Sequence, residues 1–466
     1  MKLKHTLLFT ALAALNNPAN ALEKPKTMEE MWKIIEAQQQ QIDAMKSQLQ
    51  TGSTAQPQTT TTAATKSTMQ TLERKTDVLS QEVEKLRTNL TIPEETKYKS
   101  AYGLGPAASK VYQVGKGLSI GGYGEAIYQD YVGDKKEEDK NNADLERVVL
   151  YAGYKFTDRI LFNSEIEFEH ASSGEGDELK GEVGVEFAAL DFFIDPLANI
   201  RTGLVLMPMG FINQIHEPPF FYGNHRPEVE QRIIPSTWRE MGVGLFGQIT
   251  PSLTYTTYLV NGLDASGFQS SGIKEGRGGG SQAKSEDFGY VGRMDYTPTA
   301  LPGMTLGGSV FVGNSGQNQS FAGQKADVFT QLYEGHVQWK YRGLEFRTLG
   351  SWGHIDNADI LSAAAGQTIG SSNYGWYSEV GYDIFPLFRP DTLQYLAPFF
   401  RYERFDTIAT APTGYSDDGT QDQRIYQFGL QYKPIPNVVI KADYRNRTAR
   451  QGTVPDDFNL GFGFIF

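Results

Sequence analysis

The chain closes with Phe458-Asn459-Leu460-Gly461-Phe462-Gly463-Phe464-Ile465-Phe466. In a strand, successive side chains face opposite sides. One face would then be small or polar, and the other would carry the bulky apolar side chains Phe458, Leu460, Phe462, Phe464 and Phe466. This alternation is typical of a strand that meets lipid on one face as part of a closed transmembrane β-barrel. The alternative, an edge strand of a soluble sandwich, would be a long, flat apolar edge of a kind that proteins avoid.

The first residues predict export. Lys2 and Lys4 precede the apolar run 7–15, and Ala19-Asn20-Ala21 fits the small-x-small pattern of a signal-peptide cleavage site. The apolar run is much shorter than the roughly 20 residues that a membrane-spanning helix needs. We therefore expect residues 1–21 to be a signal peptide.

Composition excludes several classes of protein. The 466 residues include 49 glycines, 24 tyrosines and 27 phenylalanines, and the mean hydropathy is −0.41. A barrel is hydrophilic on average because only alternate strand residues meet lipid. The absence of cysteine excludes a disulfide scaffold and thiol chemistry, and the net charge of −12 argues against nucleic acid as a partner.

Residues 22–92 predict a periplasmic helical segment. Apolar residues recur at heptad spacing over 28–49 and again over 69–90, which predicts a short coiled coil. The Thr/Gln/Ala-rich stretch 51–68 between them is interpreted as a linker. The alternative is an amphipathic helix packed on a barrel mouth or on a partner. Residues 93–116 are expected to form an extended tether that enters the barrel.

From residue 117 to 466 the apolar period changes to two, which predicts an all-β fold, an antiparallel transmembrane barrel. Sixteen strands are expected near 118–131, 144–156, 160–170, 181–194, 200–209, 236–249, 253–264, 286–297, 304–314, 327–341, 344–355, 372–385, 395–406, 421–433, 437–448 and 457–466. Short turns alternate with long polar connections, as in bacterial barrels with periplasmic turns and external loops. The stretch 356–365 is expected to be a short external helix, and the glycine-rich stretch 272–280 a mobile external loop.

The predicted lumen face carries charges of both signs. The candidate pore-lining residues with positive charge on this face are Arg201, Arg347, Arg401, Arg445 and Arg447. A polar lumen suits a water-filled channel. Internal salt bridges that stiffen the wall are the alternative for each of these residues.

The connection 210–235 is the third outward loop. It is rich in aromatic residues and proline, so we expect it to fold inward and to form the narrowest section of the pore. The candidate constriction residues on this loop are His216, Glu217, His225, Arg226, Glu228 and Arg232. An outer lid or a subunit-contact loop is the alternative. Histidine and glutamate could bind a metal, but nothing in the sequence fixes their geometry, so no metal site and no cofactor are expected.

The run His216 to Glu240, with His-Glu-Pro-Pro-Phe-Phe-Tyr-Gly at its start and Ile-Ile-Pro-Ser-Thr-Trp-Arg-Glu at its end, resembles the phosphate-selective porin O/P family. This resemblance implies a sixteen-stranded homotrimer that carries small anions such as phosphate or organic acids. The heptad region is similar to that of some dicarboxylate-type trimeric porins. Glutamates such as Glu165 and Glu167 stand among the basic lumen residues here, unlike the arginine and lysine ladders of the phosphate-selective members. Resemblance to other outer-membrane barrels implies that Phe466 and the alternating residues before it are read by the barrel-assembly machinery.

The sequence thus predicts an anion-leaning diffusion porin in the outer membrane of a Gram-negative cell, in contact with lipid and lipopolysaccharide. The alternative is a structural or adhesive barrel tethered to the peptidoglycan wall through its coiled coil. No catalytic spacing of Ser, His and Asp is visible, so an enzyme is not expected.

Overall fold

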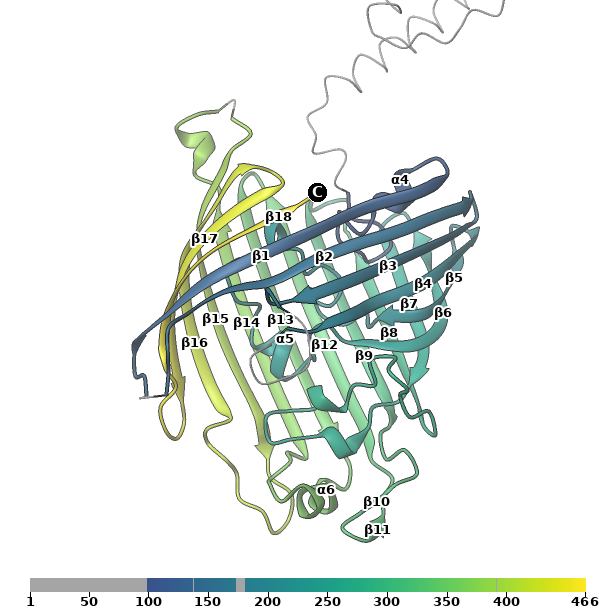
Figure 1. Ribbon diagram of the computed structural model, residues 1–466, viewed down its shortest axis with the longest axis vertical. Helices are drawn as coiled ribbons and strands as arrows, with labels where there is room; N and C mark the ends of the chain where they lie inside the picture. The colour runs from purple at the N-terminus through teal and green to yellow at the C-terminus, as the bar shows by residue number, and fades with distance from the viewer. Residues whose placement is uncertain (1–98, 137, 173–180, 391) are drawn as a thin grey trace, which may run out of the picture. The chain divides into compact units, whose positions relative to one another are not determined.

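The computed structural model describes residues 99–136, 138–172, 181–390 and 392–466 (Figure 1). The predicted signal peptide 1–21 and helical segment 22–92, with its linker 51–68, lie outside the described residues. Everything described belongs to one compact unit, Ile92–Phe466.

Sixteen antiparallel strands close into a barrel, which confirms the predicted fold and strand number. The strands are β1 (Gly117–Gly133), β2 (Asn142–Thr157), β3 (Ile160–Glu169), β4 (Val183–Asp195), β5 (Ala198–Leu206), β6 (Arg239–Thr250), β7 (Leu253–Asn261), β8 (Phe288–Tyr296), β9 (Met304–Asn314), β12 (Phe329–Tyr341), β13 (Leu344–Ile355), β14 (Ser372–Tyr382), β15 (Tyr395–Thr410), β16 (Asp422–Ile435), β17 (Val438–Ala449) and β18 (Asp456–Ile465). Each strand pairs with its neighbours in sequence, and β1 pairs with β18 to close the wall. Phe466 extends this seam, since its N–H donates to the carbonyl of Gly122 over 2.9 Å.

The connections differ at the two ends of the barrel, as predicted. Short turns join most of the strands at the end where the C-terminus lies, but a longer connection, 383–394, joins β14 and β15 there (Figure 1). Long loops join the strands at the other end. In the turn between β12 and β13, Arg342 and Gly343 both have positive φ angles of 48° and 84°. Two consecutive residues with positive φ match the right-handed twist of the flanking strands, which is why a two-residue turn suffices there.

The two faces of the last strand follow the predicted alternation. Phe458, Leu460 and Phe462 are 37%, 44% and 51% exposed on the outside of the barrel, whereas Asn459 is fully buried on the inside. The exposed outer side chains of other strands are also large and apolar, such as Met241 and Leu245 on β6. The barrel therefore presents an apolar outer face and a polar inner one, as a lipid-embedded wall requires.

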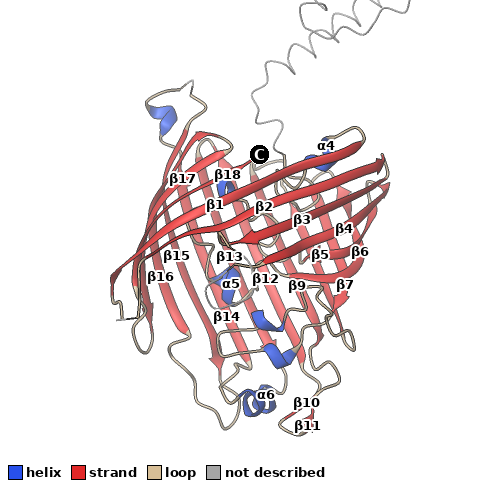
Figure 2. Cartoon of the chain, viewed as in Figure 1, coloured by secondary structure: helices blue, strands red, loops and turns tan. Residues whose placement is uncertain are grey.

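Short helices and one small hairpin lie outside the sixteen barrel strands, before β1 and in the connections between strands (Figure 2). They are α4 (Lys110–Gln113), η3 (Pro218–Phe220), α5 (Val229–Arg232), η4 (Ala265–Gly267), η5 (Lys274–Gly276), α6 (Ala358–Ala365), η6 (Phe385–Leu387) and the hairpin β10 (Ser320–Phe321) and β11 (Gln324–Lys325). The helix expected over 356–365 is α6. Among the described residues, no helix is long and apolar enough to cross a membrane.

The two strand boundaries that flank the inward connection differ from the prediction for the same reason. Strand β5 ends at Leu206 and β6 begins at Arg239, so the inward connection spans 207–238 rather than 210–235. Met207, Met209 and Trp238 are apolar and were therefore assigned to strands, but they are fully buried in a cluster inside the barrel. We call the connection 207–238 loop L3.

Candidate functional site: an inward loop between two cavities

Loop L3 leaves the wall after β5, crosses the inside of the barrel and returns at β6. Its α5 helix lies within the ring of strands (Figure 1). The Glu230 carboxylate accepts the N–H groups of Phe211 and Ile212, both over 2.8 Å, and the Tyr377 hydroxyl of β14 over 2.7 Å. One buried side chain thus joins the start of the loop, its helix and the opposite wall.

Positively charged wall residues hold the main chain of L3. Arg347 on β13 donates to the Phe220 carbonyl over 2.6 Å, and Lys441 on β17 donates to the Gly223 carbonyl over 2.8 Å. Arg401 on β15 donates to two carbonyls, those of Tyr222 over 3.1 Å and His225 over 3.0 Å. Arg293 on β8 donates to the Gly210 carbonyl. Charge-assisted hydrogen bonds are stronger than neutral ones, so these four cations fix the path of the loop.

Carboxylates of the wall complete the attachment. Asp443 accepts both the main-chain and side-chain N–H groups of Asn224, over 2.8 and 2.6 Å. Glu403 accepts the Val229 N–H over 3.3 Å and lies 2.9 Å from the Nε atom of Arg401. The mixture of charges on the lumen face thus satisfies the polar groups of an irregular chain segment inside the barrel.

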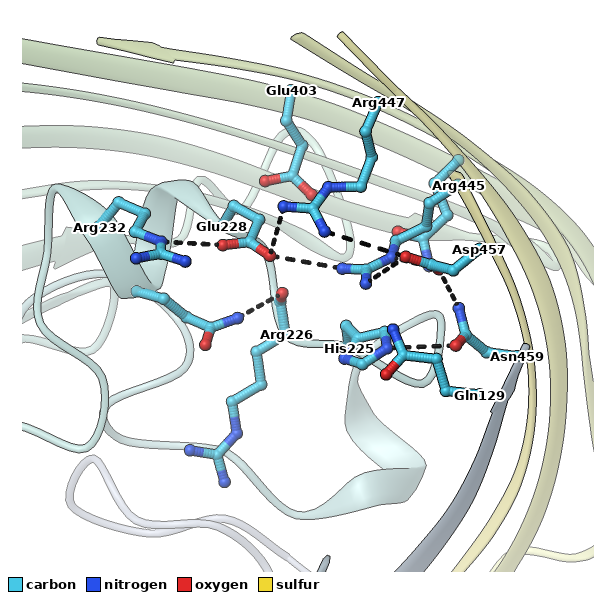
Figure 3. Close-up of polar contacts among 12 residues, drawn as sticks. Gln129, His225, Arg226, Glu228, Arg232, Glu403, Arg445, Arg447, Asp457 and Asn459 are labelled. Carbon is cyan, nitrogen blue, oxygen red and sulfur yellow. Dashed lines mark hydrogen bonds and ion pairs between the residues drawn. The ribbon is translucent and has the colours of Figure 1, made fainter. Parts of the chain in front are cut away.

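A charge network at β17 and β18 anchors the α5 end of L3 (Figure 3). Arg445 forms a two-bond pair with Asp457, at 2.8 and 2.7 Å, and its Nη1 atom lies 3.4 Å from the Glu228 carboxylate. Arg447 lies 3.9 Å from Glu228, and Arg232 pairs with Glu228 over 3.3 Å. Burial alone would raise the pKa of Glu228, but Arg447, Arg445 and Arg232 hold it at about 2.

Residues 99–116 also lie inside the barrel, but not as the extended tether that the sequence predicted. They form turns and the short helix α4, and Leu104, Ala107 and Ala108 pack on Tyr123 and Val149 of the wall. Hydrogen bonds to L3 stabilise this compact form of residues 99–116. The Glu217 carboxylate of L3 accepts the N–H groups of Ala107 and Ala108, over 2.9 and 3.2 Å.

Arg201 serves this N-terminal segment rather than L3. It pairs with Asp191 over 2.7 Å and donates to the Tyr102 carbonyl over 3.3 Å and the Tyr112 hydroxyl over 3.0 Å. The side chain is buried. Arg201 thus binds residues 99–116 to β5, from which they are distant in sequence.

L3 contributes to the walls of two cavities. The inner cavity, about 750 Å³, lies at the short-turn end and is lined by Asp158, Pro196 and the L3 residue Gln214, among others. The outer cavity, about 360 Å³, lies toward the long loops and is lined by L3 residues Asn224 to Arg226. Its charged lining consists of Glu125, Glu146, Arg147, Glu167, Glu169, Glu182, Glu186, His225, Arg226, Arg239, Lys274, Glu275 and Arg277.

The structure divides the predicted site residues into two groups. His216, Glu217 and Glu228 are buried on L3, and Arg201, Arg347, Arg401 and Arg445 are buried on the wall. The contacts of these four arginines described above are with L3, with residues 99–116 or with neighbouring carboxylates. Arg226 is also buried but lines the outer cavity with His225. Arg232 is exposed, and Arg447 is partly exposed.

Sequence reasoning missed the contribution of the next loop to this site. Lys274 and Arg277 belong to the stretch 272–280, for which the sequence predicts a mobile external loop. Both line the outer cavity, and Arg277 donates to the carbonyl of Ser236 in L3. The Gly278 N–H donates to Glu240 over 2.9 Å. Basic residues within a glycine-rich stretch were the only available signal, and they do not reveal an inward fold.

Comparison with known proteins places the chain in a family. No protein-family model matches it. An uncharacterized protein of Aquifex aeolicus (strain VF5) is 38% identical over 395 residues, which cover 82% of this chain and 87% of that protein. The chain belongs to the family of this Aquifex protein. That relationship identifies the family without naming an activity.

Among solved structures, Salmonella typhi OmpF in complex with daunomycin has a TM-score of 0.52 at 12% identity, covering 76% of this chain and 98% of that one. The likeness shows a shared porin-like barrel fold. The anion-selective porin from Comamonas acidovorans has a TM-score of 0.49 at 9% identity, covering 75% and 99% of the two chains. The outer membrane channel DcaP of Acinetobacter baumannii has a TM-score of 0.47 at 15% identity, covering 75% and 97%.

Acid is expected to weaken the attachment of L3 through His225. Burial and the neighbouring Arg445 lower the pKa of His225 to about 4, against opposing contributions from Asp443, Asp457 and Glu228. A depressed histidine pKa stabilises the fold above the ordinary value near 6.5, and this stabilisation is lost as pH falls from there through 4. Glu228 stays ionised over the same range because its pKa is about 2. Between pH 7 and pH 4 the thermal midpoint of the unmodified protein should therefore fall relative to that of His225→Gln.

His354→Gln provides the control, because this external histidine pairs with Asp356 over 3.0 Å outside L3. The control should keep the acid sensitivity of the unmodified chain. An identical pH profile for His225→Gln and the unmodified protein would show that His225 does not carry the effect.

Proposed function

We propose that the protein is an outer-membrane channel through which small hydrophilic solutes diffuse, with L3 as its constriction. The observation that carries this proposal is the position of L3, inside a closed barrel, with a cavity toward each end of the barrel. The inner and outer cavities of about 750 and 360 Å³ would be the vestibules on its two sides. Solutes would pass between L3 and the wall formed by β1 to β4, where the outer cavity lies.

The outer face of the barrel supports the membrane location. Its exposed side chains are apolar, and aromatic pairs such as Tyr333 with Trp352 and Trp376 with Tyr402 lie on it. Aromatic residues favour the interface between lipid and water. We further propose a homotrimer, an assembly signal at Phe458 to Phe466, and lipopolysaccharide around the loops. Residues 1–21 would direct export, and 22–92 would extend into the periplasm.

Planar-bilayer recording tests the proposal directly. Purified protein should insert with stepwise increases of current, because each inserted assembly adds a fixed conductance. The dense packing of the lumen favours a second candidate, a structural barrel, since residues as large as Trp238 and Arg401 are fully buried there. Folded protein that inserts without any conductance would remove the channel proposal and favour the structural barrel.

The preference for anions would depend on L3. The Nε and Nη2 atoms of Arg226 are buried and have no hydrogen-bond partner among the described residues. Its guanidinium points away from the Arg445–Asp457 pair (Figure 3). A guanidinium suits phosphate and carboxylate because it can donate two parallel hydrogen bonds. Seven glutamates line the same outer cavity, which would keep the anion preference modest.

Neutralising two L3 arginines should shift the ion selectivity toward cations. In Arg226→Gln/Arg232→Gln, the reversal potential in a salt gradient is expected to move in the cation direction, most clearly at low ionic strength where screening is weak. The matched control is Arg389→Gln/Arg424→Gln, which removes the same charge from exposed positions outside the lumen. Equal reversal potentials in the two double variants would remove Arg226 and Arg232 from the proposed selectivity.

A further inference from the structure

Three side chains with metal-binding atoms meet where L3 touches β3 and β4. The Nε2 atom of His216 lies 3.0 Å from a carboxylate oxygen of Glu165 and 3.8 Å from one of Glu186. One ligand atom from each of the three residues lies within 4.8 Å of the others. All three residues are at most 2% exposed. This cluster is independent of the arginine contacts that hold the rest of L3.

The orientation of the imidazole directs its second nitrogen at the two carboxylates. The Nδ1 atom of His216 lies 3.2 Å from the Ile212 carbonyl oxygen. A carbonyl can only accept, so Nδ1 carries the proton in this contact. In the neutral ring, Nε2 then presents a lone pair to oxygens that also carry lone pairs. Either a proton, carried by Nε2 or by one of the carboxyl groups, or a metal ion must lie between them.

The carboxylates retain unused oxygen atoms. The Oε2 atoms of both Glu165 and Glu186 are buried and have no hydrogen-bond partner among the described residues. The other oxygen of Glu186 already accepts from Thr237 over 2.7 Å and from Arg239 over 3.0 Å. A single proton on His216 would serve one Glu165 oxygen and leave both Oε2 atoms unsatisfied. Buried polar atoms without partners are costly, which favours an occupant that contacts several oxygens at once.

We propose that Glu165, Glu186 and His216 bind one divalent transition-metal ion of the zinc class. Imidazole nitrogen with carboxylate oxygen is a ligand set that suits Zn²⁺, and two carboxylates balance its charge. The hydrogen bond from Nδ1 to Ile212 is the outer contact that metal-binding histidines usually make. Spacings of 3.0 and 3.8 Å between ligand atoms suit bonds of about 2.0–2.2 Å to a common centre.

The same ion would cross-link L3 to the wall. Glu165 belongs to β3, Glu186 to β4 and His216 to L3, so a bound ion joins three chain segments. Glu186 also lines the outer cavity, which gives a metal ion a route to the cluster. The ion would hold the first half of L3, as the Arg445 and Glu228 pair holds the second.

Metal binding by the full-length protein in detergent tests the proposal, with purification through a tag that contains no histidine. After removal of metals with EDTA and return to metal-free buffer, Zn²⁺ should bind with a stoichiometry of one per chain in equilibrium dialysis with elemental analysis. The thermal midpoint should rise on binding, since the ion binds the folded state. Co²⁺ should give visible absorption bands from its nitrogen and oxygen ligands.

Substitutions of the ligands decide whether this cluster is the site. Glu165→Gln and His216→Gln should each weaken Zn²⁺ binding by more than the roughly 10- to 100-fold that loss of an outer contact costs. Both should abolish the Co²⁺ bands. His354→Gln, which removes an external histidine, should leave binding unchanged. Glu165→Gln nearly preserves side-chain shape, so this variant keeps the test valid if His216→Gln fails to fold.

Two results would overturn the proposal. Folded, metal-stripped protein that binds no Zn²⁺ would show that a proton on His216 is the only cation in the cluster. Zn²⁺ binding that survives unchanged in folded Glu165→Gln would place the ion elsewhere in the chain.

Discussion

Arg401→Ala is expected to detach L3 from the wall and to raise the single-channel conductance. The Arg401 side chain is fully buried and donates to the carbonyls of Tyr222 and His225. Its loss would also leave the buried Glu403 without its partner at 2.9 Å. Removing one member of a buried ion pair costs about 3–5 kcal/mol. We therefore expect a lower thermal midpoint together with a conductance several times that of the unmodified protein.

Arg404→Ala is the matched control for this experiment. Arg404 lies on the same strand but on its opposite face, where its side chain is 32% exposed and lies 3.5 Å from Asp422. Asp422 is buried but keeps a second cation, Arg450, at 3.8 Å, so this variant should change neither quantity much. Arg401→Lys should fall between the two, because lysine keeps the charge but loses the planar fork. A destabilised Arg401→Ala barrel with unchanged conductance would show that Arg401 stabilises the wall without positioning the constriction.

Replacing residues 101–113 by a Gly/Ser segment of equal length should also increase conductance. This segment lies inside the barrel, where Leu104, Ala107 and Ala108 pack on the wall. Residues without apolar side chains would lose this packing, at roughly 0.8 kcal/mol for each buried CH₂ group removed. The Gly/Ser segment would leave the wall, and the inner cavity, which Ala101 to Gly103 partly line, would widen. Bilayer recording and the thermal midpoint measure the two effects.

The control for this variant is a Gly/Ser replacement over 322–325, the exposed tip of the hairpin of β10 and β11. It should leave the conductance unchanged because these four residues are exposed and the buried Phe321 is kept. Equal conductance for the 101–113 replacement and the unmodified protein would show that the N-terminal segment does not restrict the path.

The strands were predictable because each must satisfy a local rule. Side chains alternate between lipid and lumen with period two, so Phe458 to Phe466 and the corresponding positions in the other strands are recognisable without tertiary contacts. The prediction was wrong at Met207 and Trp238, where apolar residues were assigned to strands. These side chains belong to L3 and are buried inside the barrel rather than exposed to lipid.

The roles of the charged lumen residues were not predictable in the same way. The alternation of side chains along each strand placed Arg201, Arg347 and Arg401 on the inner face, but it does not reveal what a side chain contacts there. Arg347 and Arg401 bind carbonyls of a loop more than 100 residues away in sequence, and Arg201 binds Tyr102. Such pairings depend on the path of L3 and residues 99–116, which no local pattern encodes. The cluster of Glu165, Glu186 and His216 has the same origin, since it joins β3, β4 and L3.

The sequence by itself determined the closed barrel, its sixteen strands, its two unlike ends and the division of each strand into an apolar and a polar face. These properties follow from backbone geometry and from the contrast between lipid and water, which act on every residue separately. Only the tertiary structure decided which lumen charges are already paired with other groups of the protein. A charged side chain inside a barrel can contact water, an opposite charge or the main chain of a loop. Contacts between segments that are distant in sequence determine which of these partners it has.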